Sequence, residues 1–179
     1  MAQTATIYNL TIDLSDIDRS VYETLELRVA QQPSETMEYM LVRVLAYCLE
    51  YCDGIALTEG VASGNEPAVL VRDLTGKITA WIEVGMPDAD RIHRGMKLAG
   101  RAAVYTHRDV VKLLRQLAAG KIHRSEEIPV YSFDRDFIET LATLIERRSQ
   151  FSLSITEREL YLNIGTRDFT TPVTEHRIA

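Results

Sequence analysis

Residues 65–85, NEPAVLVRDLTGKITAWIEVG, constrain the fold more than any other stretch, because two apolar runs flank a turn at Thr75-Gly76. If the chain reverses there, residues whose numbers sum to about 151 face each other across an antiparallel pair, with directly opposite residues ~5 Å apart. Glu83 then lies near Glu66, whereas Asp73 lies near the turn. This pattern predicts that Glu66 and Glu83 can share a site and that Asp73 is separate from it.

Glu83 is unusual because it falls inside Ile78–Val84, a run that otherwise has the composition of a buried strand. Trp81 precedes it by two residues and shares its strand face. We expect the Trp81 ring to form an apolar wall beside the acid, although a plain core position explains it nearly as well. Glu66 has its own simple explanation, as a polar residue that starts a strand before a proline.

A helix is predicted over about 35–50, after a cap at Pro33-Ser34. At about 100° per residue, Glu38 falls inside its apolar arc and Glu35 falls at the border. Glu38 either lies near the helix start, where the helix dipole favours an acid, or points into a pocket shared with Glu66 and Glu83. Three converging carboxylates would need a bound cation or raised pKa values.

The remaining periodicities complete an α/β fold with a mixed sheet flanked by helices and hairpins at both ends. We expect one domain over residues 1–179, and the tail after Gly165 shows no clear period. Strands are predicted at 4–14, 22–29, 55–58, 101–106, 128–133, 151–155 and 159–164, with further helices at 88–100, 109–119 and 134–147.

Charge is unevenly distributed along a chain whose net charge is −6. Residues 91–124 contain nine Lys or Arg and a single acid, Asp109. This segment is either a footprint for nucleic acid or another polyanion, or the solvated faces of two helices. No apolar run has membrane-spanning length and the N-terminus does not resemble a signal peptide. Cys48 and Cys52 indicate buried thiols in a reducing cytoplasm, where we expect the protein to reside.

Four short motifs together resemble the YaeQ proteins of Gram-negative bacteria: PSETMEYM at 33–40, NEP at 65–67, WIEVGMPD at 81–88 and RIHR at 91–94. The resemblance extends from about residue 4 to the last predicted hairpin. It implies a restriction-endonuclease-like core, a variant of the PD-(D/E)XK nuclease architecture. The predicted order of helix, hairpin, helix and strand over residues 34–106 matches that core.

The resemblance also implies a divalent-metal site. Glu66 matches the first acid of the nuclease motif, Glu83 the second, and Glu38, or less well Glu35, the helix acid, so Mg²⁺ or Mn²⁺ is expected at Glu38, Glu66 and Glu83. Gly85 stands where the motif has its lysine. Arg94 or Lys97 from the next helix is the expected substitute.

The implied activity is Mg²⁺-dependent phosphodiester hydrolysis, with Glu83, Glu66, Lys97 and Arg94 as catalytic residues and nucleic acid bound along 91–124. The missing lysine favours an alternative, a catalytically inactive nuclease-fold module that binds nucleic acid or protein. The overall negative charge favours a third reading, a binding or regulatory protein with no nucleic-acid role.

Overall fold

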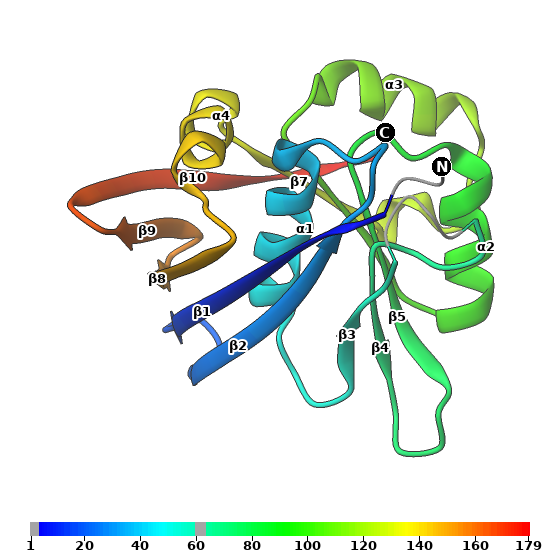
Figure 1. The fold of residues 1–179 in the computed structure, drawn as a ribbon. Coiled ribbons are helices and arrows are strands. Elements are labelled where there is room, and N and C mark those ends of the chain that lie inside the picture. The colour runs from blue at the N-terminus through cyan, green and yellow to red at the C-terminus, as the bar shows by residue number, and fades with distance from the viewer. Residues whose placement is uncertain (1–3, 60–63) are drawn as a thin grey trace.

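The structure is a computed structural model, and it describes residues 4–59 and 64–179. Its strands are β1 (Thr6–Asp16), β2 (Val21–Gln31), β3 (Ile55–Leu57), β4 (Val69–Arg72), β5 (Ile78–Val84), β6 (Ala102–Thr106), β7 (Pro129–Phe133), β8 (Arg148–Thr156), β9 (Glu159–Ile164) and β10 (Arg167–Arg177). Its α-helices are α1 (Met37–Leu49), α2 (Ala89–Ala99), α3 (Val110–Ala119) and α4 (Arg135–Leu144), with a 3₁₀ turn, η2, at Ser125–Glu127 (Figure 1).

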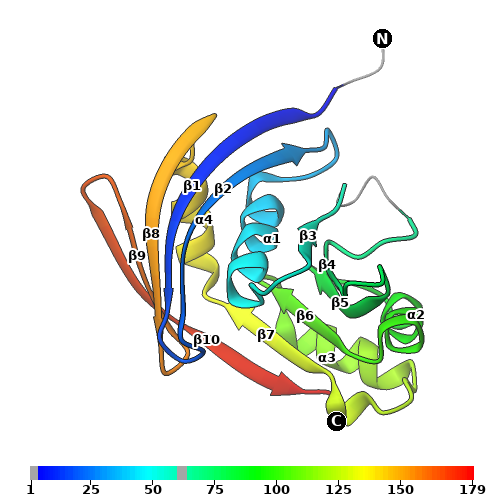
Figure 2. The same cartoon turned by 90° about the horizontal axis from the view of Figure 1, so that it is seen from below.

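All these strands form one mixed sheet in the order β2-β1-β8-β9-β10-β7-β6-β5-β4-β3. β10 joins its two halves, because it pairs with β9 over residues 167–172 and with β7 over residues 173–177. The sheet curves strongly around α1, so that α1 and α4 lie inside the curve and α2 and α3 lie outside it (Figure 2). The mixed α/β class predicted from the sequence is confirmed.

The larger core fills the inside of the curve. α1 contributes an almost continuous buried face, and strands from both halves of the sheet meet it with alternate side chains, among them Leu10, Ile12, Leu153, Leu162 and Ile82. α1 begins at Met37, because the Thr36 hydroxyl caps it by accepting from the Tyr39 amide at 3.1 Å. The predicted start at residue 35 was therefore two residues early.

The central hairpin has the predicted register. Val69 lies opposite Ile82 and Leu70 lies opposite Trp81, before a bulge shifts the pairing at Arg72. Asp73 organises the turn, since its carboxylate accepts from the Thr75 and Lys77 amides at 2.9 and 3.1 Å. The separation of Asp73 from Glu83 is confirmed.

A second core lies outside the curve, where α2 and α3 cover β5, β6 and β7. Trp81, Ile92, Val104, Leu113 and Leu117 form its centre. Trp81 is buried against Gly95, where a Cβ would lie only 2.3 Å from the indole Cγ. Trp81 is therefore a core residue on the strand face that Glu83 shares, and its role as the wall of an acid pocket stays a prediction.

The C-terminal strand β10 was not predicted. Its inward positions are Thr171 and Val173, with Phe169 half-buried, so a threonine interrupts the apolar alternation that marks a strand. Cys48 is buried as predicted but Cys52 is exposed, and both are free thiols. In the described part of the chain, no helix is long and apolar enough to cross a membrane. The restriction-endonuclease-like assignment of the core stays a prediction.

Candidate functional site

The centre of the candidate site is a paired acid and base, Glu83 and Arg91. Glu83 is 4% exposed near the end of β5. Arg91 Nε donates to Glu83 Oε2 at 2.6 Å and Arg91 Nη2 donates to Oε1 at 3.2 Å, which makes a two-pronged ion pair. The guanidinium also donates to the main-chain carbonyls of Glu66 at 2.7 Å and Gly64 at 3.3 Å. One arginine therefore holds the acid and the loop that precedes β4.

Local sequence places Arg91 there. Gly85 adopts a left-handed φ of 87°, which turns the chain at the end of β5. Asp88 then caps α2 by accepting from the Arg91 amide at 2.9 Å, so Arg91 lies in the first helical turn. Burial and the arginine have opposite effects on the acid. Burial raises the pKa of Glu83, while the hydrogen bond and charge of Arg91 lower it, and Glu83 in turn raises the pKa of Arg91.

The carboxylate and the main-chain carbonyl of Glu66 have different partners. Its Oε1 lies 4.0 Å from Arg72 Nη2, and the side chain is 41% exposed. It borders a separate hollow of about 380 Å³, together with Arg28 and Arg43. Glu66 and Glu83 are therefore linked through Arg91, by the Glu66 carbonyl and not by its acid group.

The two helix acids lie apart from this pair in different surroundings. Glu35 is buried and pairs with Arg43 at 3.0 Å. Glu38 is half-buried in the first turn of α1. Its charge acts on His107, whose pKa is lowered by burial and by Arg108 and raised by Glu38.

These placements do not form the predicted metal centre. Across residues 4–59 and 64–179, no three His, Cys, Asp or Glu side chains are grouped as metal ligands. The structure pairs Glu83 with Arg91 and places the Glu66 carboxylate nearest Arg72, so Glu38, Glu66 and Glu83 do not gather into one cluster among the described residues. In this arrangement the donor set does not fit an Mg²⁺ or Mn²⁺ ion held by these three residues. Their role as metal ligands stays a prediction.

The expected lysine substitutes lie on the exposed side of α2. Arg94 Nη1 donates to the Gly64 carbonyl at 3.3 Å, so Arg94 converges on the loop that Arg91 binds. Lys97 is exposed in the last turn of α2. Their catalytic roles, and those of Glu66 and Glu83, stay predictions.

Sequence reasoning missed Arg91 as a site residue, although it stands in the RIHR motif and in the basic segment. A signal was present. Asp88 is a helix-capping residue, and the third residue after a cap lies in the first turn, beside the end of the strand that enters the helix. An arginine there is within reach of an acid near the strand end.

The basic segment separates into paired and unpaired residues. Arg101 pairs with Glu50 and Arg124 with Glu127, in addition to the Arg91 pair. The other exposed cations, in the part of the chain that the structure describes, form no ion pair; they are Arg94, Lys97, Arg108, Lys112, Arg115 and Lys121. Most of them lie on the solvent-facing side of α2 and α3, which therefore carries positive charge on an acidic protein.

The fold and the site define a mixed α/β protein in which a curved sheet surrounds a central helix. In its site, Arg91 of α2 forms an ion pair with the buried carboxylate of Glu83. The family model described as YaeQ protein matches residues 1–173, and the chain belongs to the YaeQ family, as its motifs suggested. "Uncharacterized protein YaeQ" of Escherichia coli (strain K12) is 29% identical over 165 residues, or 91% of each chain. The protein of the same description from Salmonella typhi is 28% identical over the same span.

Two solved structures share the whole architecture. The crystal structure of YaeQ protein from Pseudomonas syringae has a TM-score of 0.90 and 28% identity, and the match covers 97% of each chain. The YaeQ protein from Xanthomonas axonopodis pv. citri has a TM-score of 0.88 and 29% identity, with 98% of this chain and 100% of that chain covered.

Proposed function

We propose that this protein is a nuclease-like binding module that engages the phosphate backbone of nucleic acid through the outer side of α2 and α3. The observation that carries the proposal is the set of exposed cations on these helices that have no acidic partner in the described chain, on a protein whose net charge is −6. Clustered Lys and Arg attract a polyanion even when the whole protein is acidic.

The composition of this surface favours phosphate contacts over base reading. Lys97, Lys112 and Arg115 are exposed, and their ammonium and guanidinium groups are hydrogen-bond donors of the kind that bind phosphate oxygens. The aromatic residue of the basic segment, Tyr105, is 3% exposed and belongs to the inner core. Without an exposed ring for stacking, recognition rests on the backbone, so binding is expected to depend strongly on salt and weakly on sequence.

The ion pair between Glu83 and Arg91 favours a binding function over hydrolysis. Glu83 is bonded at both oxygens by Arg91, and arginine remains protonated, so it is a poor proton shuttle. Mg²⁺-dependent phosphodiester hydrolysis is the second candidate. The buried acid near the end of β5 is the feature that favours it, and this activity requires Arg91 to release Glu83.

The binding test uses labelled single- and double-stranded DNA and RNA, with affinity measured by fluorescence anisotropy over a series of salt concentrations. The double variant Lys112→Gln/Arg115→Gln should weaken binding and reduce the slope of log K against log salt by roughly 2 for duplex DNA. The matched control is Arg28→Gln/Arg148→Gln, which removes the same charge from exposed positions on β2 and β8. Equal loss in the control, or no salt-dependent binding by the wild type, would overturn the proposal.

A cleavage assay on the same substrates separates the two candidates. We expect binding without cleavage in Mg²⁺ or Mn²⁺. Cleavage that disappears in Glu83→Ala would establish the hydrolase instead, and Lys97→Ala and Arg94→Ala would then identify the basic group. Absence of nucleic-acid binding would favour a protein-binding role. We place this function in the cytoplasm, where free thiols such as the exposed Cys52 remain reduced.

A further inference from the structure

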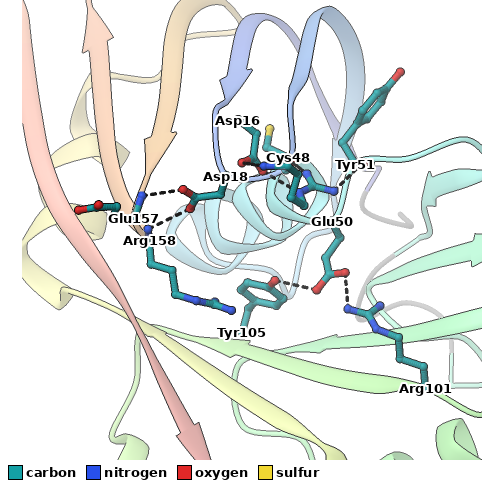
Figure 3. A network of polar contacts seen from close by, with 10 residues as sticks. Asp16, Asp18, Cys48, Glu50, Tyr51, Arg101, Tyr105, Glu157 and Arg158 are labelled. Carbon is teal, nitrogen blue, oxygen red and sulfur yellow. Dashed lines mark hydrogen bonds and ion pairs between the residues drawn. The ribbon is translucent and has the colours of Figure 1, made fainter.

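A second cavity lies inside the curve of the sheet, away from Glu83. Its volume is about 670 Å³, within the usual range for small-molecule pockets. It is built where the two halves of the sheet approach each other, from the C-terminal end of α1, the turns of the β1–β2 and β8–β9 hairpins, and strands β6, β7 and β10. Figure 3 shows the network of polar contacts at the cavity, including the lining residues Glu50, Arg101, Tyr105 and Arg158.

The floor of the cavity is a pair of stacked tyrosines. The rings of Tyr105 and Tyr131 are 4.7 Å apart at an angle of 26°. Leu49, Ile155 and Val173 add apolar surface to the walls. This combination can accept the apolar body of a small organic molecule.

Most acids around the cavity are already saturated by the protein. Glu50 accepts from the Tyr105 hydroxyl at one oxygen and from Arg101 at the other, both at 2.7 Å. Asp16 is buried and bound by Arg19 at 2.7 Å. Asp18 accepts from the Glu157 and Arg158 amides at 2.7 and 3.0 Å. These carboxylates have little capacity left for a cationic ligand.

Two arginines retain donor capacity. Arg101 donates to Glu50 through Nη2 alone in the described structure, yet its side chain is 48% exposed. Arg158 lies 5.0 Å over the Tyr131 ring, pairs with Glu175 at 3.2 Å and is 53% exposed. Each guanidinium carries five N–H donors in a planar fork that suits carboxylate or phosphate oxygens. In Figure 3 the two side chains reach toward Tyr105 and Glu50 from opposite sides.

The hairpin turn that carries Arg158 is a two-residue loop between β8 and β9. Glu157 and Arg158 both have left-handed φ angles, 51° and 61°, which non-glycine residues rarely adopt. The Asp18 carboxylate holds both amides of this turn from the neighbouring hairpin. Positive φ at both positions is the conformation that two-residue hairpin loops favour, and the Asp18 contact fixes the turn from which the Arg158 side chain extends.

We infer that this cavity is a binding site for a small organic oxyanion, with Arg101 and Arg158 holding its carboxylate or phosphate group and the tyrosine floor receiving its apolar body. The exposed acid at its rim, Glu157, opposes such a ligand and limits its affinity. The site is separate from the α2–α3 surface. Tyr105 and Tyr131 belong to the core inside the curve of the sheet, whereas α2 and α3 lie outside it, and Arg158 lies in the β8–β9 turn.

The test uses four probes and isothermal titration calorimetry. Phenyl phosphate and benzoate carry both an oxyanion and an apolar ring, inorganic phosphate lacks the ring, and benzyl alcohol lacks the charge. We expect saturable binding of phenyl phosphate, benzoate or both, weaker binding of inorganic phosphate, and none of benzyl alcohol. Comparison of the first two probes distinguishes a phosphate ligand from a carboxylate ligand.

Variants assign the binding to this cavity. Arg158→Gln should lower the affinity for the bound probe ~10-fold, as expected for the loss of a charge-assisted hydrogen-bond partner. Glu157→Gln should raise the affinity for the probe. Arg148→Gln, on the exposed start of β8, should leave the affinity unchanged. Arg101→Gln/Glu50→Gln is a second loss variant that leaves no unpaired buried acid. The melting temperature of each variant confirms its folding.

Three results would overturn the inference. They are the absence of saturable binding by every anionic probe, equal binding of benzyl alcohol, and affinity that neither Arg158→Gln nor the Arg101→Gln/Glu50→Gln pair reduces.

Discussion

The Glu35 carboxylate and the Arg43 guanidinium meet at 3.0 Å in the core, where their side chains are 0% and 1% exposed. Arg43 also donates to the carbonyls of Thr58 at 2.8 Å and Ala30 at 3.0 Å. One buried arginine thus ties α1 to the end of β2 and to the segment after β3. Arg43 belongs to the framework that positions the candidate site, and Glu35 is its counter-ion.

Arg43→Ala should destabilise the protein strongly. It leaves the buried Glu35 carboxylate without a counter-ion and two carbonyls without their donor, which costs about 3–5 kcal/mol for a broken buried pair. Urea unfolding measures the free-energy difference. Glu35→Gln/Arg43→Met, which removes both charges, should cost less. A larger loss in the double variant would show that the Arg43 bonds to the carbonyls, and not the lone charge, dominate.

Gly95→Ala should destabilise the second core. A methyl group on Gly95 would lie 2.3 Å from Trp81 Cγ, so α2 must move away from β5 or the ring must turn. Overpacking of this kind costs about 1–3 kcal/mol. The control is His93→Ala on the exposed side of the same helix, which should change stability by less than about 0.5 kcal/mol. Unfolding by urea, with Trp81 fluorescence as the signal, reports both variants.

The sequence was informative wherever a local pattern determines geometry. Alternation on both sides of Thr75-Gly76 specifies a hairpin register, because side chains in a strand alternate strictly between faces. The pairing of Leu70 with Trp81 follows from it. The oddity of Glu83 was also real, since it is a buried acid with an arginine partner. On the first helix the buried acid is Glu35, which the pattern placed only at the border of the apolar arc, whereas Glu38 is half-buried.

Contacts between distant segments could not be predicted in the same way. Helical periodicity places Glu38 within an apolar face, but the neighbours of that face depend on how the sheet curves. In the structure β10 joins the two halves of the curved sheet by changing partner near Pro172, and the polar sequence of β10 did not predict a strand at all. Arg91 bridges Glu83 to the Glu66 carbonyl through tertiary contacts that neither segment encodes alone.

Arg91→Gln should raise the pKa of Glu83 further. Burial already raises it and Arg91 opposes that effect, so removal of the arginine leaves burial dominant. A raised pKa means that the folded state holds the proton more tightly. The stability of the wild type relative to Glu83→Gln is therefore greatest below the unfolded pKa and falls as pH rises through the folded pKa. In Arg91→Gln this fall should extend to higher pH.

Two measurements check this pH dependence. Carbon-13 NMR follows the Glu83 carboxyl directly, and urea unfolding from about pH 4 to about pH 8 follows its stability contribution. Glu127, an exposed residue, is the control, because its pKa is lowered by Arg124 and should not respond to Arg91. A lower Glu83 pKa in Arg91→Gln would contradict the prediction.

Asp18→Ala should loosen the β8–β9 turn without disturbing the rest of the sheet. The Glu157 and Arg158 amides would lose their acceptor while keeping their left-handed φ angles. Amide hydrogen exchange should accelerate at these two residues and stay unchanged in the β4–β5 hairpin. The hydrogen bonds to these amides lower the pKa of Asp18, so the same loosening should appear in the wild type as pH falls through that lowered pKa. Exchange rates that do not change in Asp18→Ala would show that the turn keeps its conformation without the Asp18 carboxylate.

Gly85→Lys restores the lysine of the nuclease motif, yet it should lower stability and produce no cleavage. Gly85 has a φ of 87°, and a Cβ there would lie 3.2 Å from the Tyr39 ring. The left-handed conformation alone costs a non-glycine residue about 1–2 kcal/mol. The new side chain would also start from a turn and not from an extended strand, so it would not follow the direction that the motif requires.

Gly76 provides the matched control, since it has the same φ of 87° but open space where a methyl group would lie. Gly76→Ala therefore measures the backbone strain, and Gly85→Ala measures that strain together with the contact on Tyr39. We expect Gly85→Ala to be the more destabilising of the two in urea unfolding, with Gly85→Lys at least as severe. Metal-dependent cleavage by Gly85→Lys at wild-type stability would instead mean that the end of β5 can open, and the hydrolase would then become the better supported function.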